Sequence, residues 1–302
     1  MRVLVLGSGV VGTSSAYYLA RAGYPTASEH SMPSHIDYEK LLTKVIHLVE
    51  HAGMLLVAEW QLPEGPRGSG DKADVDIEVE SLLRPGLMQI LNCDFWGEET
   101  GYQLTGAKHC WVVDPNDGTA DFLRGYKGSA ISVALLEDSQ PVLGVVYAPV
   151  LPEGDHDCIA WAKGLPSVLR NGGAVKTTLA HKKWNQRSRV MISTAAKEKP
   201  KINSKLCSPA GFVAMPSIAY RLARVAAGDG DAGVSVVPVS AHDVAAGHAL
   251  LIGAGGVLLD ENGNSITYTA TARMQIVSRR CFGGTLEACQ TLVTRAWSKV
   301  FT

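Results

Sequence analysis

The sequence is poor in the features that define specialised protein classes. Its 302 residues include six cysteines with no C-x-x-C pair. That scatter argues against a disulfide scaffold and indicates reduced thiols in a cytoplasmic protein. Basic and acidic residues nearly balance, 28 against 29, so no positive excess points to nucleic acid or a membrane surface as a partner. We expect no membrane span and no signal peptide, because the apolar runs are short.

The first 24 residues, MRVLVLGSGVVGTSSAYYLARAGY, have the pattern of a strand, a glycine turn and a helix. They resemble the opening of a flavin-dependent D-amino-acid dehydrogenase. A dinucleotide fold needs a second strand that delivers an acidic residue to the ribose, and the polar stretch that follows predicts none. We therefore expect residues 1–34 to form a βα appendage without a cofactor. The alternatives are a cofactor site, or a segment fused from another gene or read from a wrong start.

The rest of the chain is predicted to form two αβ halves, residues 35–183 and 184–302, with a break near residues 181–187. Apolar periodicity predicts helices over 36–59, 77–91 and 217–227, and a helix that begins near residue 243. Strands are predicted over 110–113, 129–136, 142–147 and 190–193, and Asp138-Ser139 should turn the second into the third.

Three acidic groups stand out: GEET with Glu98 and Glu99, DPNDGT with Asp114 and Asp117, and HDVAAG with Asp243. Asp114 follows an apolar pair at the end of a predicted strand, and a stiff proline turn should bring Asp117 back beside it. Carboxylates this close repel each other unless cations lie between them, and hard oxygen ligands suit Mg²⁺. The alternative for DPNDGT alone is a surface turn, a common use of Asp, Asn and Gly.

The order and spacing of these groups resemble the inositol monophosphatase family of metal-dependent phosphomonoesterases, over about residues 36–300. The resemblance implies a mixed α/β (α+β) fold, a layered αβαβα sandwich, to which residues 1–34 are added. It also implies two or three Mg²⁺ ions. Their ligands would be oxygen atoms of Glu98, Asp114, Asn116 through its carbonyl, Asp117 and Asp243.

In this resemblance Glu98, Asp114 and Asn116 hold the first ion, and Asp114 is shared with the second. A third, weaker ion would lie near the loop around Lys72 and Asp76. Paired metals lower the pKa of water and neutralise phosphoryl charge.

Catalytic roles are implied for Glu98, Asp114 and Thr119. Glu98, with the Thr119 hydroxyl as a relay, would take the proton of the water, and the amides of Gly118 and Thr119 would hold the phosphate. Lys72 is expected to contribute to substrate binding.

The expected substrate is a small phosphate ester, and the stretch PVLGVVYAP (141–149) is closer to bacterial 3′(2′),5′-bisphosphate nucleotidases. Val236 stands where inositol phosphatases tend to have a glutamate, so inositol is expected to be a poor substrate. Arg221 is predicted either to meet a second phosphate or to form a structural ion pair. Two further departures from the family pattern are His242 for a tryptophan, interpreted as a packed histidine, and Gly253 for a glutamate.

Other functions remain open. Inositol monophosphate or a sugar phosphate are alternatives within the class, and a flavin or nicotinamide oxidoreductase or a catalytically silent binding protein are alternatives outside it. The sequence HLVEH, His47 to His51, matches a zinc-peptidase pattern. Both histidines fall opposite the apolar stripe of their helix, so a solvated helix face is the better interpretation. A homodimer is left open.

Overall fold

The structure, a computed structural model, describes residues 36–154, 156–269 and 272–301. Residues 38–302 form one compact unit. The predicted βα appendage and its glycine turn lie outside the described residues. The division at 183/184 falls between the last strand of one large sheet and the first strand of the other, and the division into two halves stays a prediction.

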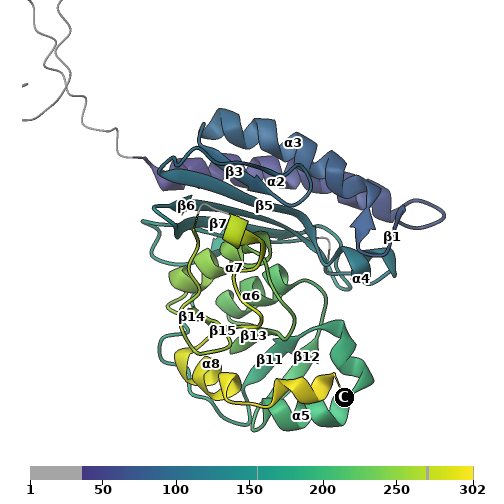
Figure 1. Ribbon diagram of the computed structural model, residues 1–302, viewed down its shortest axis with the longest axis vertical. Coiled ribbons are helices and arrows are strands. Elements are labelled where there is room, and N and C mark those ends of the chain that lie inside the picture. The colour runs from purple at the N-terminus through teal and green to yellow at the C-terminus, as the bar shows by residue number, and fades with distance from the viewer. Residues whose placement is uncertain (1–35, 155, 270–271, 302) are drawn as a thin grey trace, which may run out of the picture. The chain divides into compact units, whose positions relative to one another are not determined.

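Two helices, α2 (Tyr38–Trp60) and α3 (Asp74–Ile90), form the first layer. They pack on an eight-stranded sheet in the order β10-β9-β8-β7-β6-β5-β3-β4 (Figure 1). Its strands are β3 (Asp94–Gly97), β4 (Tyr102–Gln103), β5 (His109–Asp117), β6 (Ala130–Glu137), β7 (Gln140–Ala148), β8 (Asp157–Ala162), β9 (Leu169–Arg170) and β10 (Gly173–Ala174). All neighbours are antiparallel except β3 and β5.

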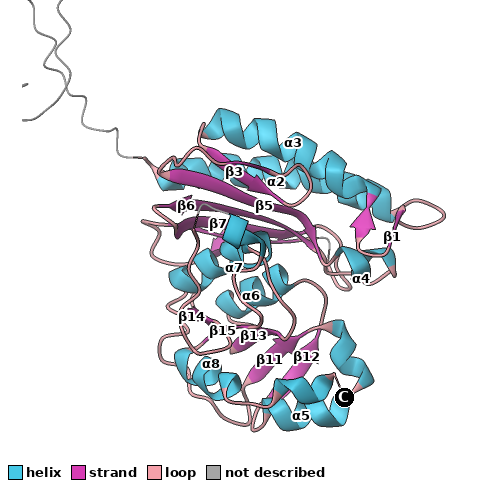
Figure 2. Cartoon of the chain, viewed as in Figure 1, coloured by secondary structure: helices cyan, strands magenta, loops and turns pink. Residues whose placement is uncertain are grey.

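A five-stranded sheet, in the order β12-β11-β13-β15-β14, makes the second β layer. Its strands are β11 (Arg189–Ile192), β12 (Gly211–Ala214), β13 (Ala232–Ser235), β14 (Val257–Leu259) and β15 (Cys281–Gly284). Helices α6 (Ile218–Ala226) and α7 (Ala241–Gly253) lie between the sheets, and α5 (Pro200–Cys207) and α8 (Leu286–Val293) cover the outer face (Figures 1 and 2). The predicted αβαβα sandwich is confirmed.

The remaining elements are short. They are β1 (Gly68–Ser69), β2 (Lys72–Ala73), α4 (Thr119–Leu123) and the 3₁₀ turns Thr194–Glu198, Ala272–Gln275 and Trp297–Val300. The hairpin β1–β2 packs against α4, which brings the Lys72 loop beside the end of β5.

Helix α2 forms because Leu42, Val45, Val49, Ala52 and Leu56 recur at helical spacing and are all buried. By length and composition alone, the helix is long and apolar enough to span a bilayer. The sequence analysis predicted no stretch of this kind, and that prediction was wrong. In the structure its buried stripe packs against α3, β7 and β8, as in the core helix of a soluble protein.

The hairpin between β6 and β7 turns at Asp138 and Ser139, as predicted. Both residues have positive φ, 48° and 65°, the conformation that a two-residue hairpin turn needs to match strand twist. Strand β5 is longer than predicted: it continues through Asp114 to Asp117, with a register shift against β6 between these two residues.

Helix α7 packs tightly because it presents small residues to both sheets. A Cβ on Gly253 would lie 2.4 Å from the ring of Trp161, and a Cβ on Gly144 of β7 would lie 2.5 Å from the Ala246 carbonyl. Gly253, where the family pattern has a glutamate, therefore has a packing reason: the indole of Trp161 occupies the space.

We expect Gly253→Ala to destabilise the fold by about 1–2 kcal/mol, because the clash with Trp161 outweighs a gain of about 1 kcal/mol in helix propensity. Urea unfolding measures this change. Gly211→Ala is the control, since a Cβ added to Gly211 would have nothing within 4 Å, and it should stay within about 0.5 kcal/mol of the parent. Equal effects of the two substitutions would contradict the packing argument.

Candidate functional site

The end of β5 carries the central carboxylate. Asp114 is 1% exposed, and its Oδ1 accepts a hydrogen bond from the Asn116 amide at 2.9 Å. Gly118 has φ 96° and a Cβ there would come 3.0 Å from the Ser217 nitrogen, so only glycine lets the chain leave β5 and enter α4 in this space.

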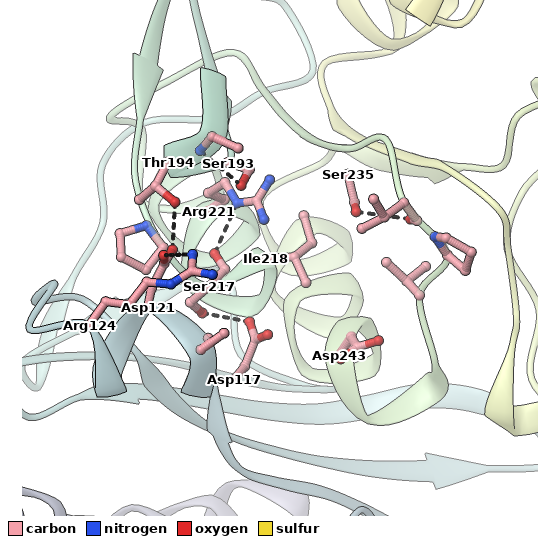
Figure 3. A pocket seen from close by; sticks show the side chains of 17 residues that line it. Asp117, Asp121, Arg124, Ser193, Thr194, Ser217, Ile218, Arg221, Ser235 and Asp243 are labelled. Carbon is pink, nitrogen blue, oxygen red and sulfur yellow. Dashed lines mark hydrogen bonds and ion pairs between the residues drawn. The ribbon is translucent and has the colours of Figure 1, made fainter. Parts of the chain in front are cut away.

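Asp117 joins β5 to the layer of helices between the sheets. Its Oδ2 accepts hydrogen bonds from the Ser217 hydroxyl and the Ala219 amide, each at 2.6 Å; Figure 3 shows the first of these bonds. These donors leave Oδ1 of Asp117 available on the side of the cavity. The start of α6 therefore fixes the orientation of the Asp117 carboxylate.

Asp243 lies in the first turn of α7, where its Oδ2 accepts a hydrogen bond from the Ser240 amide. This bond caps the helix and fixes the side chain. The backbone one residue earlier is also fixed, because the Ser132 hydroxyl of β6 donates to the His242 carbonyl at 3.0 Å.

Glu98 lies in the loop after β3, and a buried carboxylate on α3 shapes that loop. Glu80 accepts hydrogen bonds from the amides of Glu99 and Thr100 at 3.0 and 2.7 Å. A Cβ on Gly97 would lie 2.1 Å from Glu80 Oε1. The glycine of WGEET thus lets the loop close onto Glu80.

These elements bring the carboxylates into two groups that share Asp114. One consists of Glu98, Asp114 and His242, the other of Asp114, Asp117 and Asp243, and in each group the ligand atoms lie within 4.8 Å of one another. The predicted side-chain ligands of both ions are thus brought together. The sequence pattern did not single out His242 as a ligand.

The His242 side chain is partly buried, with 14% of its surface exposed, and its ring faces the carboxylates. Nε2 lies 3.8 Å from Glu98 Oε1 and 3.7 Å from Asp243 Oδ1. Nδ1 is buried without a hydrogen-bond partner among the described residues. Burial lowers the pKa of this imidazole, and the charge of Glu98 opposes that effect.

Burial and mutual repulsion raise the pKa of the clustered carboxyl groups. The pKa of Asp117 and that of Asp243 rise to about 6, chiefly by desolvation, and that of Glu98 rises to about 7 for the same reason. The pKa of Asp114 is raised most strongly by desolvation and then by the charges of Glu98, Asp117 and Asp243. The ionised cluster is unfavourable without a counter-charge.

The donor set fits a hard divalent cation. Four carboxylates meet around Asp114, and the side-chain oxygen of the fully buried Asn116 has no hydrogen-bond partner among the described residues. The Asn116 carbonyl oxygen, the predicted ligand, accepts a hydrogen bond from the Thr119 hydroxyl at 2.8 Å. Its second lone pair is left for a cation. Oxygen donors of this kind suit Mg²⁺.

The predicted relay from Glu98 through Thr119 stays a prediction, and another carboxylate lies beside Thr119. The Thr119 hydroxyl lies 3.1 Å from Asp76 Oδ2, and the described residues include no hydrogen bond between Thr119 and Glu98. Asp76 also accepts the Asn116 side-chain amide at 2.9 Å. Desolvation raises the pKa of Asp76 to about 6. The carboxylate beside Thr119 is therefore that of Asp76.

Asp76 and Glu80 are the site residues for which the sequence prediction found no firm role. They are four residues apart on α3 and both are buried, between the apolar positions Val75, Val79 and Leu83. Carboxylates at this spacing inside an apolar helix face are rare unless they are paired. That pattern is the signal that could have found them.

A cavity of about 300 Å³ opens beside Asp117 and Asp243. Figure 3 shows Arg221, Arg124 and Ile218 among the side chains that line it. Arg221 is buried, and its Nε and Nη1 donate to the carbonyls of Ser217 and Val234.

Two predictions about the substrate side change in detail. Val236 is packed against the core around β13, whereas its neighbour Val237, which is exposed, lines the cavity. The valine that borders the cavity is therefore Val237, one residue after the predicted position. Lys72 is exposed on β2 and belongs to neither carboxylate group. Burial raises the pKa of Glu99, and the positive charge of Lys72 opposes that rise.

Comparisons with known proteins agree with this architecture. The model of the inositol monophosphatase family matches residues 39–296. The chain is 31% identical over 232 residues to inositol monophosphatase 3 of Solanum lycopersicum, covering 74% of this chain and 80% of the relative. It is 24% identical over 268 residues to the 3′(2′),5′-bisphosphate nucleotidase CysQ of Buchnera aphidicola, covering 82% and 95%.

A solved structure, the IMPase of Thermotoga maritima, superimposes with a TM-score of 0.69 at 21% identity. The match covers 87% of this chain and 98% of that one. At this identity the likeness supports the fold.

The raised carboxyl pKa values predict how stability depends on pH. A carboxyl group whose pKa is higher in the folded than in the unfolded state stabilises the fold below its unfolded pKa, and that contribution is lost as pH rises through the folded pKa. Asp117, Asp243 and Glu98 titrate near 6 to 7 in the fold. The melting temperature of the metal-free protein should therefore fall between about pH 4 and 7.

Mg²⁺ at pH 7.5 should restore several degrees of that loss, because it neutralises the ionised cluster. Asp117→Asn removes one of the repelling charges, so it should raise the metal-free melting temperature at pH 7.5 by about 2–4 °C and weaken the pH dependence. Asp138→Asn, in the exposed hairpin turn, is the control. A melting temperature that rises from pH 4 to 7 without metal would contradict the prediction.

Proposed function

The chain belongs to the inositol monophosphatase family and is a phosphoric monoester hydrolase, and we propose that it hydrolyses a nucleoside 3′(2′),5′-bisphosphate with two Mg²⁺ ions. The family is Mg²⁺-dependent and acts on small phosphorylated substrates. The observation that carries the proposal is the meeting of Glu98, Asp114, Asp117 and Asp243 beside a cavity lined by guanidinium groups.

Asp114 is the residue on which the two-ion arrangement depends. It belongs to both groups of ligand atoms, so it would be a ligand at both cation positions. Glu98 would complete one position and Asp117 with Asp243 the other. When bound, Mg²⁺ supplies the positive charge that lowers the pKa of the attacking water and neutralises the phosphoryl oxygens.

In this proposal Thr119 and Asp76 accept the proton of the attacking water, Thr119 as the relay and Asp76 as the final acceptor. The single Thr119 hydroxyl proton can point to the Asn116 carbonyl at 2.8 Å or to Asp76 Oδ2 at 3.1 Å. In the second orientation the hydroxyl accepts a hydrogen bond from water while it donates to Asp76. Asp76 is held by the Asn116 amide and the Ala73 amide, so it keeps its orientation as charge moves. Glu98 remains in this proposal as a cation ligand and not as the end of the relay.

Two guanidinium groups, those of Arg221 and Arg124, would bind the second phosphate of the substrate. Arg221 already donates Nε and Nη1 to backbone carbonyls, which holds the guanidinium plane rigid and leaves Nη2 for a ligand. Arg124 lines the same cavity with an exposed side chain and lies 3.9 Å from Asp121 Oδ1. Guanidinium groups bind phosphate through charge-assisted hydrogen bonds.

The apolar part of the cavity wall favours a base over a polyol. Ile218, Val237 and Pro238 contribute apolar surface to the cavity and offer no donor or acceptor for ring hydroxyls. The 24% identity to a bisphosphate nucleotidase over 95% of its length is compatible with this substrate. Inositol monophosphate is the second candidate, because the tomato relative carries that name at 31% identity.

Phosphate release tests the substrate. We expect 3′-phosphoadenosine 5′-phosphate to exceed adenosine 3′-monophosphate by about 10- to 150-fold in kcat/KM, which corresponds to about 1.5–3 kcal/mol for a charge-assisted contact. Arg221→Met should reduce that ratio toward one. The ratio within one variant cancels any loss of folded protein, which matters because Arg221 also supports two backbone carbonyls.

Inositol 1-phosphate is measured beside the nucleotides. A parent enzyme that prefers it, or shows no preference between the bisphosphate and the monophosphate, would overturn the nucleotidase proposal and leave the phosphatase activity in place. Lys205→Met, on the distant helix α5, is the control for a lost positive charge.

Asp76→Asn should lower kcat by about 10²- to 10⁴-fold, because the amide cannot accept the proton relayed by Thr119. Isothermal titration with Mg²⁺ separates this role from metal binding, since Asp76 belongs to neither ligand group. Mg²⁺ affinity should stay within about threefold of the parent. A fall in Mg²⁺ affinity that matches the fall in kcat would show a ligand role instead.

A further inference from the structure

His242 has unused hydrogen-bonding capacity in a place where that is costly. Among the described residues Nδ1 is buried without a partner, and Nε2 has its nearest carboxylate oxygens at 3.7 and 3.8 Å, beyond hydrogen-bond distance. A buried nitrogen without a hydrogen-bond partner loses the free energy that water would have supplied to it. Nε2 is not among the buried unpaired atoms of the described residues, so it is the ring nitrogen that a ligand can reach.

The backbone that carries the ring is held in place. The Ser132 hydroxyl donates to the His242 carbonyl at 3.0 Å, and the next residue, Asp243, caps α7 through the Ser240 amide. These contacts fix the backbone on both sides of the Cα atom from which the ring extends toward Glu98 and Asp243.

The distances suit a shared cation. Two donor atoms bound to one ion at about 2.1 Å lie no more than about 4.2 Å apart. Nε2 of His242 meets this limit with Glu98 Oε1 at 3.8 Å. Asp114 belongs to the same group, in which all ligand atoms lie within 4.8 Å of one another. The charges around the ring are acidic, Glu80 and Glu99 included, so they favour a cation there.

We propose that His242 is a nitrogen ligand at the Glu98–Asp114 position and that it makes this position selective for a divalent transition-metal ion such as Co²⁺ or Zn²⁺ over Mg²⁺. The proposal rests on the metal site of the proposed function, which it refines at one of the two positions. Imidazole is a good ligand for borderline transition ions, whereas Mg²⁺ prefers oxygen donors and retains water.

A pair of exposed histidines in the described part of the chain can confound such a measurement. His47 and His51 are exposed one turn apart on α2, and two histidines at this spacing can hold a transition ion. His51→Gln removes that pair without touching the site. All binding measurements are therefore made on the full chain with His51→Gln, with and without His242→Gln.

The experiment measures binding and not turnover. The protein is stripped with a chelator, and Co²⁺, Zn²⁺ and Mg²⁺ are titrated separately by calorimetry, with the visible absorption of bound Co²⁺ recorded in parallel. His242→Gln replaces the nitrogen donor by an oxygen donor of similar reach. We expect this substitution to lower the affinity for Co²⁺ and Zn²⁺ by at least about tenfold and to change the absorption spectrum of bound Co²⁺. Mg²⁺ affinity should change by less than about threefold.

The outcomes separate this inference from the proposed function. Unchanged Co²⁺ affinity and spectrum in His242→Gln, with Mg²⁺ binding intact, would overturn the nitrogen ligand and leave the phosphatase proposal standing. Equal losses for Co²⁺ and Mg²⁺ would assign His242 a structural role as an ion-pair partner of Glu98 and Asp243, which also overturns the selectivity. A chain that binds none of the three ions would overturn both proposals.

Discussion

The site depends on the repulsion between carboxylates that the fold forces together around Asp114. Asp114 is buried, and the charges of Glu98, Asp117 and Asp243 all raise its pKa. A protein does not hold such a cluster ionised at neutral pH without positive charge in its midst. The rest of the fold therefore offsets the unfavourable free energy of this repulsion. Cation binding relieves the repulsion, and that relief contributes to the affinity for cations. Metal binding and stability are two measures of one electrostatic arrangement.

The carboxylates around Asp114 come from separate segments, and neutral donors hold two of them. Backbone and hydroxyl groups bond to Asp117 and Asp243, so their orientation does not depend on other charges. Asp117 bonds to the start of α6, and Ser132 of the first sheet bonds to the residue before Asp243. These contacts cross between the layers. The two predicted halves are thus joined through the site itself, in agreement with the single compact unit that residues 38–302 form.

The sequence predicted several features because they are local, whereas the layered sandwich and the proposed ligand set came from the family resemblance. The stripe of α2, the hairpin at Asp138-Ser139 and the acidic groups each appear within a short stretch of residues. What it could not supply was the direction of individual side chains. Val236 packs against the core whereas Val237 lines the cavity, and the carboxylate beside the Thr119 hydroxyl is that of Asp76. Both arrangements depend on tertiary geometry.

Helix α3 shows how a remote element takes part in the chemistry. Asp76 and Glu80 lie four residues apart and so share one face of the helix. Asp76 bonds to Asn116 and Thr119 at the end of β5, and Glu80 shapes the loop that carries Glu98. A single rigid helix therefore sets the spacing between the proposed proton acceptor and a proposed cation ligand. Because the buried Leu83 and Leu87 belong to the same helix, packing far from the phosphate is coupled to the geometry at the reacting atoms.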